Sequence, residues 1–176
     1  RGDLTARGFV ATAAPITWPA TVGRPIEAWR YDRPPQGNPR ATFNSLLQLF
    51  RPMVDVHTDE ITVNMLWSPT AKPLWNYTVS VFLLHSSGQI ACLEDCNHDS
   101  YPFENRSPTL NWEKGGLYFD SHTLNISNLP AGQYQVGVKV YYFTDTNFTQ
   151  LTIAPASDCS ANADCEFILL EPIEIR

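Results

Sequence analysis

The sequence predicts an all-β protein, an antiparallel β-sandwich of the Ig-like or jelly-roll-like kind with an extended N-terminal arm. Three observations lead to this prediction. From Leu46 onward, short runs rich in β-branched and aromatic residues alternate with clusters of Pro, Gly, Asn and Ser. The run Gln133 to Phe143 places Tyr or Val at every second position, the period of a half-buried strand. The first 42 residues lack such a period and are rich in Pro and Arg.

The arm, which we assign to residues 1–42, comes first, and residues 43–176 form the sandwich domain. The arm is too short of periodic apolar residues to build its own core, yet its large apolar side chains are costly to leave in water. A segment of this kind usually lies in a groove, either of its own domain or of a neighbouring copy. The arm residues that we expect to make this contact are Phe9, Val10, Ile16, Trp18, Val22 and Ile26.

Charge separates the two parts of the chain. Through Arg51, seven Arg stand against three acidic residues, a balance of +4, whereas the remainder has fifteen acidic against five basic residues, a balance of −10. A basic arm is attracted to an acidic body, its own or a neighbour's. The alternative is that Arg only solubilises an apolar arm.

Ten short strands are expected after the arm. In chain order they are 46–50, 54–56, 61–67, 77–85, 89–93, 116–120, 123–127, 133–143, 150–153 and 166–175. The runs 123–127 and 133–143 flank a Pro-Ala-Gly turn and are predicted to pair as a hairpin, with the Tyr/Val face in the core and Asn125 facing outward. Pro172 pushes the last strand toward a sheet edge or a bulge.

Residues 60–143 resemble the secreted β-sandwich modules of the pre-peptidase C-terminal type, which are appended to bacterial proteases. The residues that carry the resemblance are Trp67, Gly88, Leu129, Gly132 and Tyr134. Where that family tends to place Asp in the strand after the Trp, this chain has Thr78 and Ser80, so an ion site is not carried over. The resemblance implies an accessory module rather than an enzyme.

Cysteines and sequons indicate a secreted glycoprotein. Four N-x-Ser/Thr sequons are present, at Asn76, Asn105, Asn125 and Asn147. Four cysteines allow three disulfide connectivities, of which we favour Cys92–Cys96 and Cys159–Cys165 because each pair is close in sequence. The first residue is Arg and no signal-like apolar segment is present, which fits a mature extracellular or cell-surface form, and no apolar run is long enough to span a membrane.

The sequence offers little for chemistry. No nucleophile motif accompanies His57, His85, His98 or His122, so we expect no catalytic residues. The acidic loop with Glu94, Asp95, Asn97 and Asp99 is either a weak calcium candidate or a solvated loop, and the cysteines lack zinc-like spacing. We therefore expect no metal and no cofactor. The acidic body argues against nucleic acid as a partner.

These observations favour a structural function. We expect a subunit of an extracellular glycoprotein filament that assembles head to tail with copies of itself, the arm of one copy docking on the sandwich of the next. One alternative is a monomeric secreted carbohydrate-binding or adhesion module that uses Trp75, Tyr101 and Phe103. Another is an accessory domain of a larger secreted enzyme, whose gene would continue past Arg176.

Overall fold

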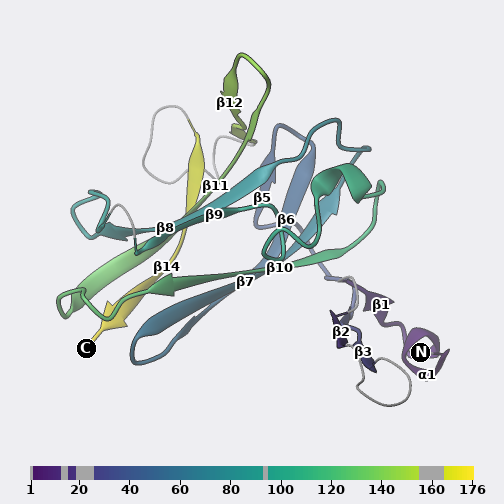
Figure 1. Cartoon of the computed structure of the whole chain (residues 1–176), viewed down its shortest axis with the longest axis horizontal. Helices are drawn as coiled ribbons and strands as arrows, with labels where there is room; N and C mark the ends of the chain where they lie inside the picture. The colour runs from purple at the N-terminus through teal and green to yellow at the C-terminus, as the bar shows by residue number, and fades with distance from the viewer. Residues whose placement is uncertain (1, 13–15, 19–25, 93–94, 155–164) are drawn as a thin grey trace.

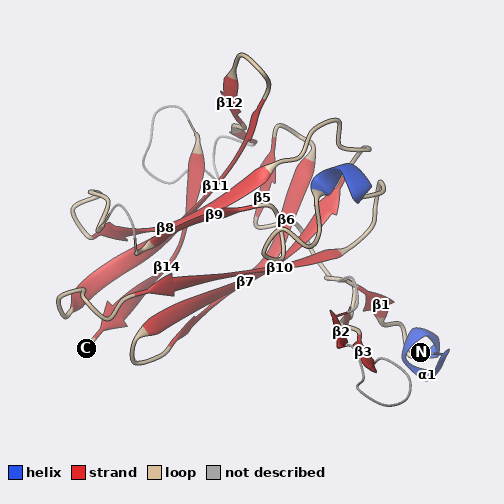
Figure 2. Ribbon diagram, viewed as in Figure 1, coloured by secondary structure: helices blue, strands red, loops and turns tan. Residues whose placement is uncertain are grey.

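Two antiparallel sheets packed face to face make up the body of the protein (Figure 1). The computed structural model describes residues 2–12, 16–18, 26–92, 95–154 and 165–176. One sheet has the strand order β10-β7-β6-β5-β13, and the other has the order β12-β11-β8-β9, with β14 also paired to β11. The predicted all-β sandwich is confirmed, and helix is confined to two short segments of the described chain (Figure 2).

The strands of the body are β5 (Ala41–Phe43), β6 (Leu47–Val56), β7 (Glu60–Pro69), β8 (Thr78–His85), β9 (Asn97–Ser100), β10 (Tyr118–Asn125), β11 (Gly132–Phe143), β12 (Phe148–Gln150), β13 (Ile153–Ala154) and β14 (Phe167–Ile175). A single 3₁₀ turn, η1 (Thr109–Asn111), interrupts the described loop between β9 and β10. The N-terminal part contains α1 (Gly2–Ala6), β1 (Val10–Ala11), β2 (Ile16–Trp18), β3 (Ile26–Ala28) and β4 (Tyr31–Asp32).

The core lies between the two sheets, where alternate residues of each strand meet. On β11 the predicted inner face is confirmed for Tyr134, Val136, Val138 and Val140, which are all buried, while Tyr142 is half-buried at the rim. Trp67 and Trp112 are both buried in this core. No described member of the core cluster precedes Ala41, so the sandwich buries its apolar side chains without the arm.

The predicted hairpin between residues 123–127 and 133–143 is wrong. β10 pairs with β7 in one sheet, whereas β11 pairs with β8, β12 and β14 in the other. The Pro-Ala-Gly segment therefore crosses from sheet to sheet, and Ile126 in this crossing is buried against the core. The alternation of apolar and polar residues predicted the inward face of both strands correctly. This alternation is the same whether two strands pair in one sheet or face each other across a core, so it did not predict the pairing.

Several strand boundaries also differ from the prediction. Residues 46–50 and 54–56 form one strand, β6, with a register irregularity between Phe50 and Met53 where Arg51 has a φ of 43°. Residues 116–120 and 123–127 likewise merge into β10. The predicted strand 89–93 is reduced to a bridge between Ile90 and Leu84, and its place beside β8 is taken by the polar strand β9. The expectation for Pro172 is confirmed, because β14 is a sheet-edge strand whose register with β11 shifts next to it.

The arm pairs with itself. β1 pairs with β4 and β2 pairs with β3, both in antiparallel register, which makes two short two-stranded sheets that we together call the ribbon. In Figure 1 this ribbon and α1 stand away from the two sheets, at the lower right. The sequence suggested an arm without strands. The short runs Ile16–Trp18 and Ile26–Ala28 nevertheless pair as β-strands.

Candidate functional site

The arm is joined to the edge strand β10 at Thr12. The Phe119 N–H donates to the Thr12 carbonyl over 2.6 Å, and the Thr12 N–H donates to the Arg30 carbonyl over 3.1 Å. The Thr12 hydroxyl donates to the Asp32 carboxylate over 2.5 Å, and Thr12 is buried. These bonds fix the root of the arm on the sandwich, because Thr12 ties together both strands of the ribbon and β10.

A ladder of two aromatic rings between two guanidinium groups strengthens the root. The Arg30 guanidinium lies 3.5 Å from the ring centroid of Phe119 and pairs with the Asp32 carboxylate over 2.8 Å. Phe119 packs edge-on against Phe103 at 5.6 Å, and the Arg106 guanidinium lies 5.5 Å from the Phe103 ring. Cation–π contacts of partly desolvated groups contribute on the order of 0.5 to 2 kcal/mol each. The root is therefore a defined joint between arm and sandwich.

The predicted arm residues fall on both sides of this joint. Phe9 is half-buried under the Arg33 guanidinium, which lies 4.9 Å from its ring, and Val10 is 37% exposed. Ile16 and Trp18 lie in β2 and Ile26 in β3, beyond the root, while Val22 lies outside the described residues. The prediction that these residues contact a groove stays a prediction.

An apolar surface covers the outer side of the sheet built on β11 and β8. We call it the aromatic face and define it by its apolar side chains, Phe82, Leu84, Ile90, Tyr141, Phe143, Phe148 and Phe167. Ile90, Phe143 and Phe148 are 53%, 65% and 54% exposed. The rings of Tyr141, Phe143 and Phe148 contact one another with centroids 5.1 to 5.5 Å apart.

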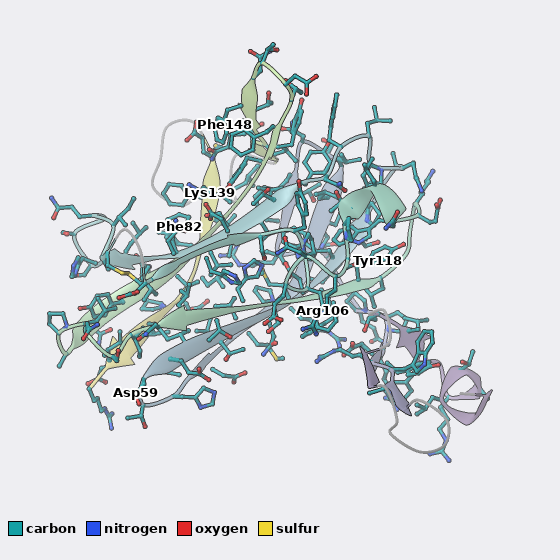
Figure 3. The ribbon with its side chains drawn as sticks, in the orientation of Figure 1. Asp59, Phe82, Arg106, Tyr118, Lys139 and Phe148 are labelled. Carbon is teal, nitrogen blue, oxygen red and sulfur yellow. A yellow bond between two sulfur atoms is a disulfide. The ribbon has the colours of Figure 1, made fainter. Side chains whose placement is uncertain are left out.

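A hollow of about 260 Å³ opens in this face, with Phe82 and Phe167 among its walls. Phe82 lies flat against β11, since a Cβ at Gly137 would meet its Cζ at 2.4 Å. Lys139 lies between two rings, its Nζ 5.4 Å from Phe82 and 5.9 Å from Tyr141. Phe148, Lys139 and Phe82 follow one another across the side of the sandwich away from the arm (Figure 3).

A second concavity, of about 310 Å³, lies where the arm root meets the body. We call it the root cleft; its walls include Trp29, Trp112 and Tyr118, with the polar residues Arg106, Ser107 and Asn111. Trp112 and Tyr118 stack with centroids 4.4 Å apart and planes 3° from parallel. The Trp112 indole N–H donates to the Ser107 hydroxyl over 2.9 Å, which fixes the ring.

Four polar side chains of β10 and β9 face the interior of the sandwich. Asp120 and His122 come from β10, and His98 and Ser100 come from β9. The Asp120 carboxylate accepts hydrogen bonds from the Trp67 indole N–H at 3.1 Å and from the Phe103 N–H at 2.7 Å, and lies 3.1 Å from His122 Nε2. The rings of His98 and His122 lie 4.9 Å apart.

Burial and neighbouring charges act on the titration of this cluster in opposite directions. Burial alone would raise the pKa of the Asp120 carboxyl, but His122 and the donors from Phe103 and Trp67 outweigh it and hold the pKa below its usual value. Burial, followed by the repulsion of His122, lowers the pKa of His98. Asp120 and His122 are fully buried, so this Asp-His pair has no access to a substrate in solution.

The sequence missed this cluster, although it contains two of the four histidines considered for catalysis. A signal was present: Asp120 and His122 share the alternation phase of the buried Leu124, so a single continuous strand would have placed them in the core. His57 and His85 lie elsewhere, with His57 exposed and the His85 ring 5.0 Å from Tyr134. Among the described residues, no group of three or more His, Cys, Asp or Glu is arranged to hold a metal ion.

The described side chains of the acidic loop bond to different partners and do not form a common calcium site. The Asn97 amide oxygen accepts from Ser80, and the Asp99 carboxylate accepts from the Tyr141 hydroxyl over 2.9 Å. Burial first, then Asp99, raises the pKa of Tyr141. Glu94 lies outside the described residues.

The predicted disulfide Cys92–Cys96 is present. Cys165 is disulfide-bonded as well, and Cys159, its predicted partner, lies outside the described residues.

All four sequons fall on described residues. Asn105, Asn125 and Asn147 are exposed, and Asn125 faces outward as expected. Asn76 is half-buried, and its amide oxygen accepts from the Leu110 N–H over 3.1 Å. The occupancy of these sequons stays a prediction.

The aromatic residues predicted for an adhesion module do not form one site. Trp75 is 43% exposed and stacks on Tyr142 at 5.4 Å. Tyr101 is 37% exposed, and Phe103 is half-buried in the ladder of the arm root. Among the described residues, the two most exposed aromatic rings, Phe143 and Phe148, lie instead on the aromatic face.

No protein-family model and no curated protein matches the chain. Among solved structures, the C-terminal domain of wzt aligns with 8% identity over 73% of this chain and 76% of that one, with a TM-score of 0.46. β-Glucosidase 3B from Thermotoga neapolitana aligns with 12% identity and a TM-score of 0.36, over 74% of this chain and 16% of that one. None of the described helices has the length and apolar character that a membrane crossing requires.

Proposed function

We propose that the protein is a structural subunit of an extracellular glycoprotein filament, in which the arm of each copy docks on the sandwich of the next. The observation that carries the proposal is the position of the arm. Its ribbon projects from the body in Figure 1, and the described core contains none of its residues. An isolated two-stranded ribbon is only marginally stable in water, so a projecting ribbon with apolar residues calls for a surface to pack against.

Charge and compartment support this proposal. The basic N-terminal part is complementary to the acidic remainder of another copy. An arm that binds a different surface on a second copy makes a heterologous contact, which extends into a filament where the rotation does not close. The Cys92–Cys96 disulfide and the exposed sequons suit an oxidising, extracellular environment.

We infer a non-catalytic role because the Asp-His pair is enclosed in the core. Asp120 and His122 are 0% exposed, and the hydroxyl of the nearby Ser100 is buried too. Hydrolysis requires a nucleophile that reaches its substrate. In the described part of the chain, we therefore assign this buried cluster a structural role in the core.

Deletion of residues 1–30 tests the proposal. Because the sandwich core begins at Ala41, the shortened chain is expected to remain folded and monomeric, whereas the full chain assembles. Light scattering measures the size of the particles, and electron micrographs distinguish filaments from dispersed molecules. Unchanged assembly of a folded, shortened chain would show that the arm is not the assembling element.

A second candidate, saccharide binding, is favoured by the root cleft. Trp29 and Tyr118, which stacks on the buried Trp112, supply ring surface for the C–H faces of a sugar, and Arg106 and Asn111 supply hydrogen-bond donors. A glycan array probed with the full chain and with Asn111→Ala tests it. Saturable binding by the full chain that the variant loses would favour a binding module, and absence of binding would remove this candidate.

A further inference from the structure

The aromatic face is unusual because two large rings are more than half exposed side by side. Phe143 and Phe148 stand opposite each other in the β11–β12 pairing, with ring centroids 5.4 Å apart. Tyr141 packs behind these rings, and Lys139, whose Nζ lies over both the Tyr141 and Phe82 rings, links them to the hollow. Contiguous apolar surface of this kind marks an interaction site in soluble proteins.

The hollow is too small for most independent ligands. Its volume of about 260 Å³ lies below the roughly 300 to 1,000 Å³ of typical small-molecule pockets. It suits one large apolar side chain from a peptide segment, with the neighbouring rings packing beside it. The arm offers large apolar residues at intervals, among them Ile16, Trp18 and Ile26.

The aromatic face lies too far from the arm root of the same copy to bind it. The described part of the arm and the line Phe148, Lys139, Phe82 lie on opposite sides of the sandwich in Figure 3. A contact between these two surfaces joins different copies and is heterologous, as head-to-tail growth requires.

The border of the face carries acidic groups. Asp99 is bonded to Tyr141 at one side, Asp145 lies in the turn between β11 and β12, and Glu166 lines the hollow. Lys139 lies inside the face between the rings. Such a border complements the basic arm, whose part of the chain has a balance of +4.

The nearby sequon leaves the face uncovered. In the pairing of β11 with β12, Thr149 lies opposite Tyr142. Tyr142 packs on Trp75 and Tyr77, on the other side of this strand pair from Phe143. Asn147 shares the phase of Thr149, and its N–H donates to the Thr144 hydroxyl over 3.0 Å. A glycan attached here extends from the side opposite the aromatic face.

From these observations we propose that the aromatic face is the receptor for the arm of the next copy, with an apolar side chain of the β2–β3 ribbon in the hollow. This assignment rests on the proposed filament function and adds to it the surface that is bound.

The first test is the double variant Phe143→Glu with Phe148→Glu. Both side chains are exposed, so the fold should be retained, and each Glu adds an acidic charge to an apolar contact. Loss of two central aromatic contacts is expected to raise the concentration needed for assembly by on the order of 30-fold or more. The matched control is Met53→Glu, at a residue of 53% exposure on β6 in the other sheet, which should assemble as the native chain does.

The second test is a photo-crosslink from the arm in the full chain. A benzoylphenylalanine at the position of Trp18 should crosslink between copies to peptides containing Phe82, Phe143 or Phe167, as read by mass spectrometry of mixed isotope-labelled copies. Crosslinks to the root cleft or to the β6 side would overturn the receptor assignment.

The two proposals fail separately. If deletion of residues 1–30 disperses the assembly while the Phe143/Phe148 variant assembles normally, the receptor is elsewhere and the proposed function stands. If the deletion leaves assembly intact, both proposals are wrong.

Discussion

The sandwich and the arm use the same strand chemistry with opposite results. The sandwich packs two sheets and fully buries large side chains such as Trp67, Trp112 and Phe43. The arm pairs strands of two or three residues into two short sheets, with no second described layer over β2 and β3. Pairing alone satisfies backbone groups but buries little apolar surface, so the ribbon depends on the joint at its root.

The largest effect should come from the point where the core supports that joint. Asp120→Ala removes the acceptor of the Trp67 and Phe103 donors and leaves His122 unpaired inside the core. Breaking a buried polar network in this way costs about 3 to 5 kcal/mol. Urea denaturation measures the change in the free energy of unfolding.

Asp99→Ala is the matched control, because Asp99 is exposed and accepts one bond from Tyr141. Its expected cost is about 0.5 to 1.5 kcal/mol. Equal destabilisation by the two variants would contradict the supporting role given to the buried cluster.

A smaller and more local effect is expected at the arm root. Arg30→Ala removes the guanidinium from Phe119 and from Asp32, at a cost of about 1 kcal/mol in this partly exposed position. Because the core does not include the arm, the free energy of unfolding of the sandwich should change little, while the arm should be cut faster by chymotrypsin after Phe9 or Tyr31.

Arg7→Ala serves as the comparison for proteolysis, since it removes an arginine outside the ladder. The joint would lose its assigned role if Arg30→Ala left the rate of cleavage in the arm unchanged.

The contrast between regions also explains what the sequence could predict. Strand period identified the core face of β11 and the fold class, because alternation reports which side of a strand meets apolar neighbours. It failed for the partner of β10, since Leu124 and Ile126 point into the same core whether their strand pairs with β11 or faces it.

The candidate sites were harder to predict because they depend on which strands meet across the body. β9 looks like a polar loop in sequence, and only its pairing with β8 turns His98 and Ser100 toward Asp120 and His122. The aromatic face needs the register of three strands, since Phe82 comes from β8, Tyr141 from β11 and Phe167 from β14. The predicted disulfide Cys92–Cys96 required no such information, because its two residues are close in sequence.

The smallest expected effect is a pH dependence of the sandwich that the arm should not share. Burial and His122 lower the pKa of His98 in the folded protein below its ordinary value of 6.5. As the pH falls below 6.5, the unfolded chain takes up a proton at His98 before the folded chain does, so stability declines until the folded pKa is passed. Asp120 affects a different pH range. Because its pKa is lowered, its contribution to the stability of the fold declines only as the pH falls below about 3.8. His98→Gln should therefore lose less thermal stability between pH 7 and pH 5 than the native chain, and an equal loss in both would show that another group, not His98, controls this pH range.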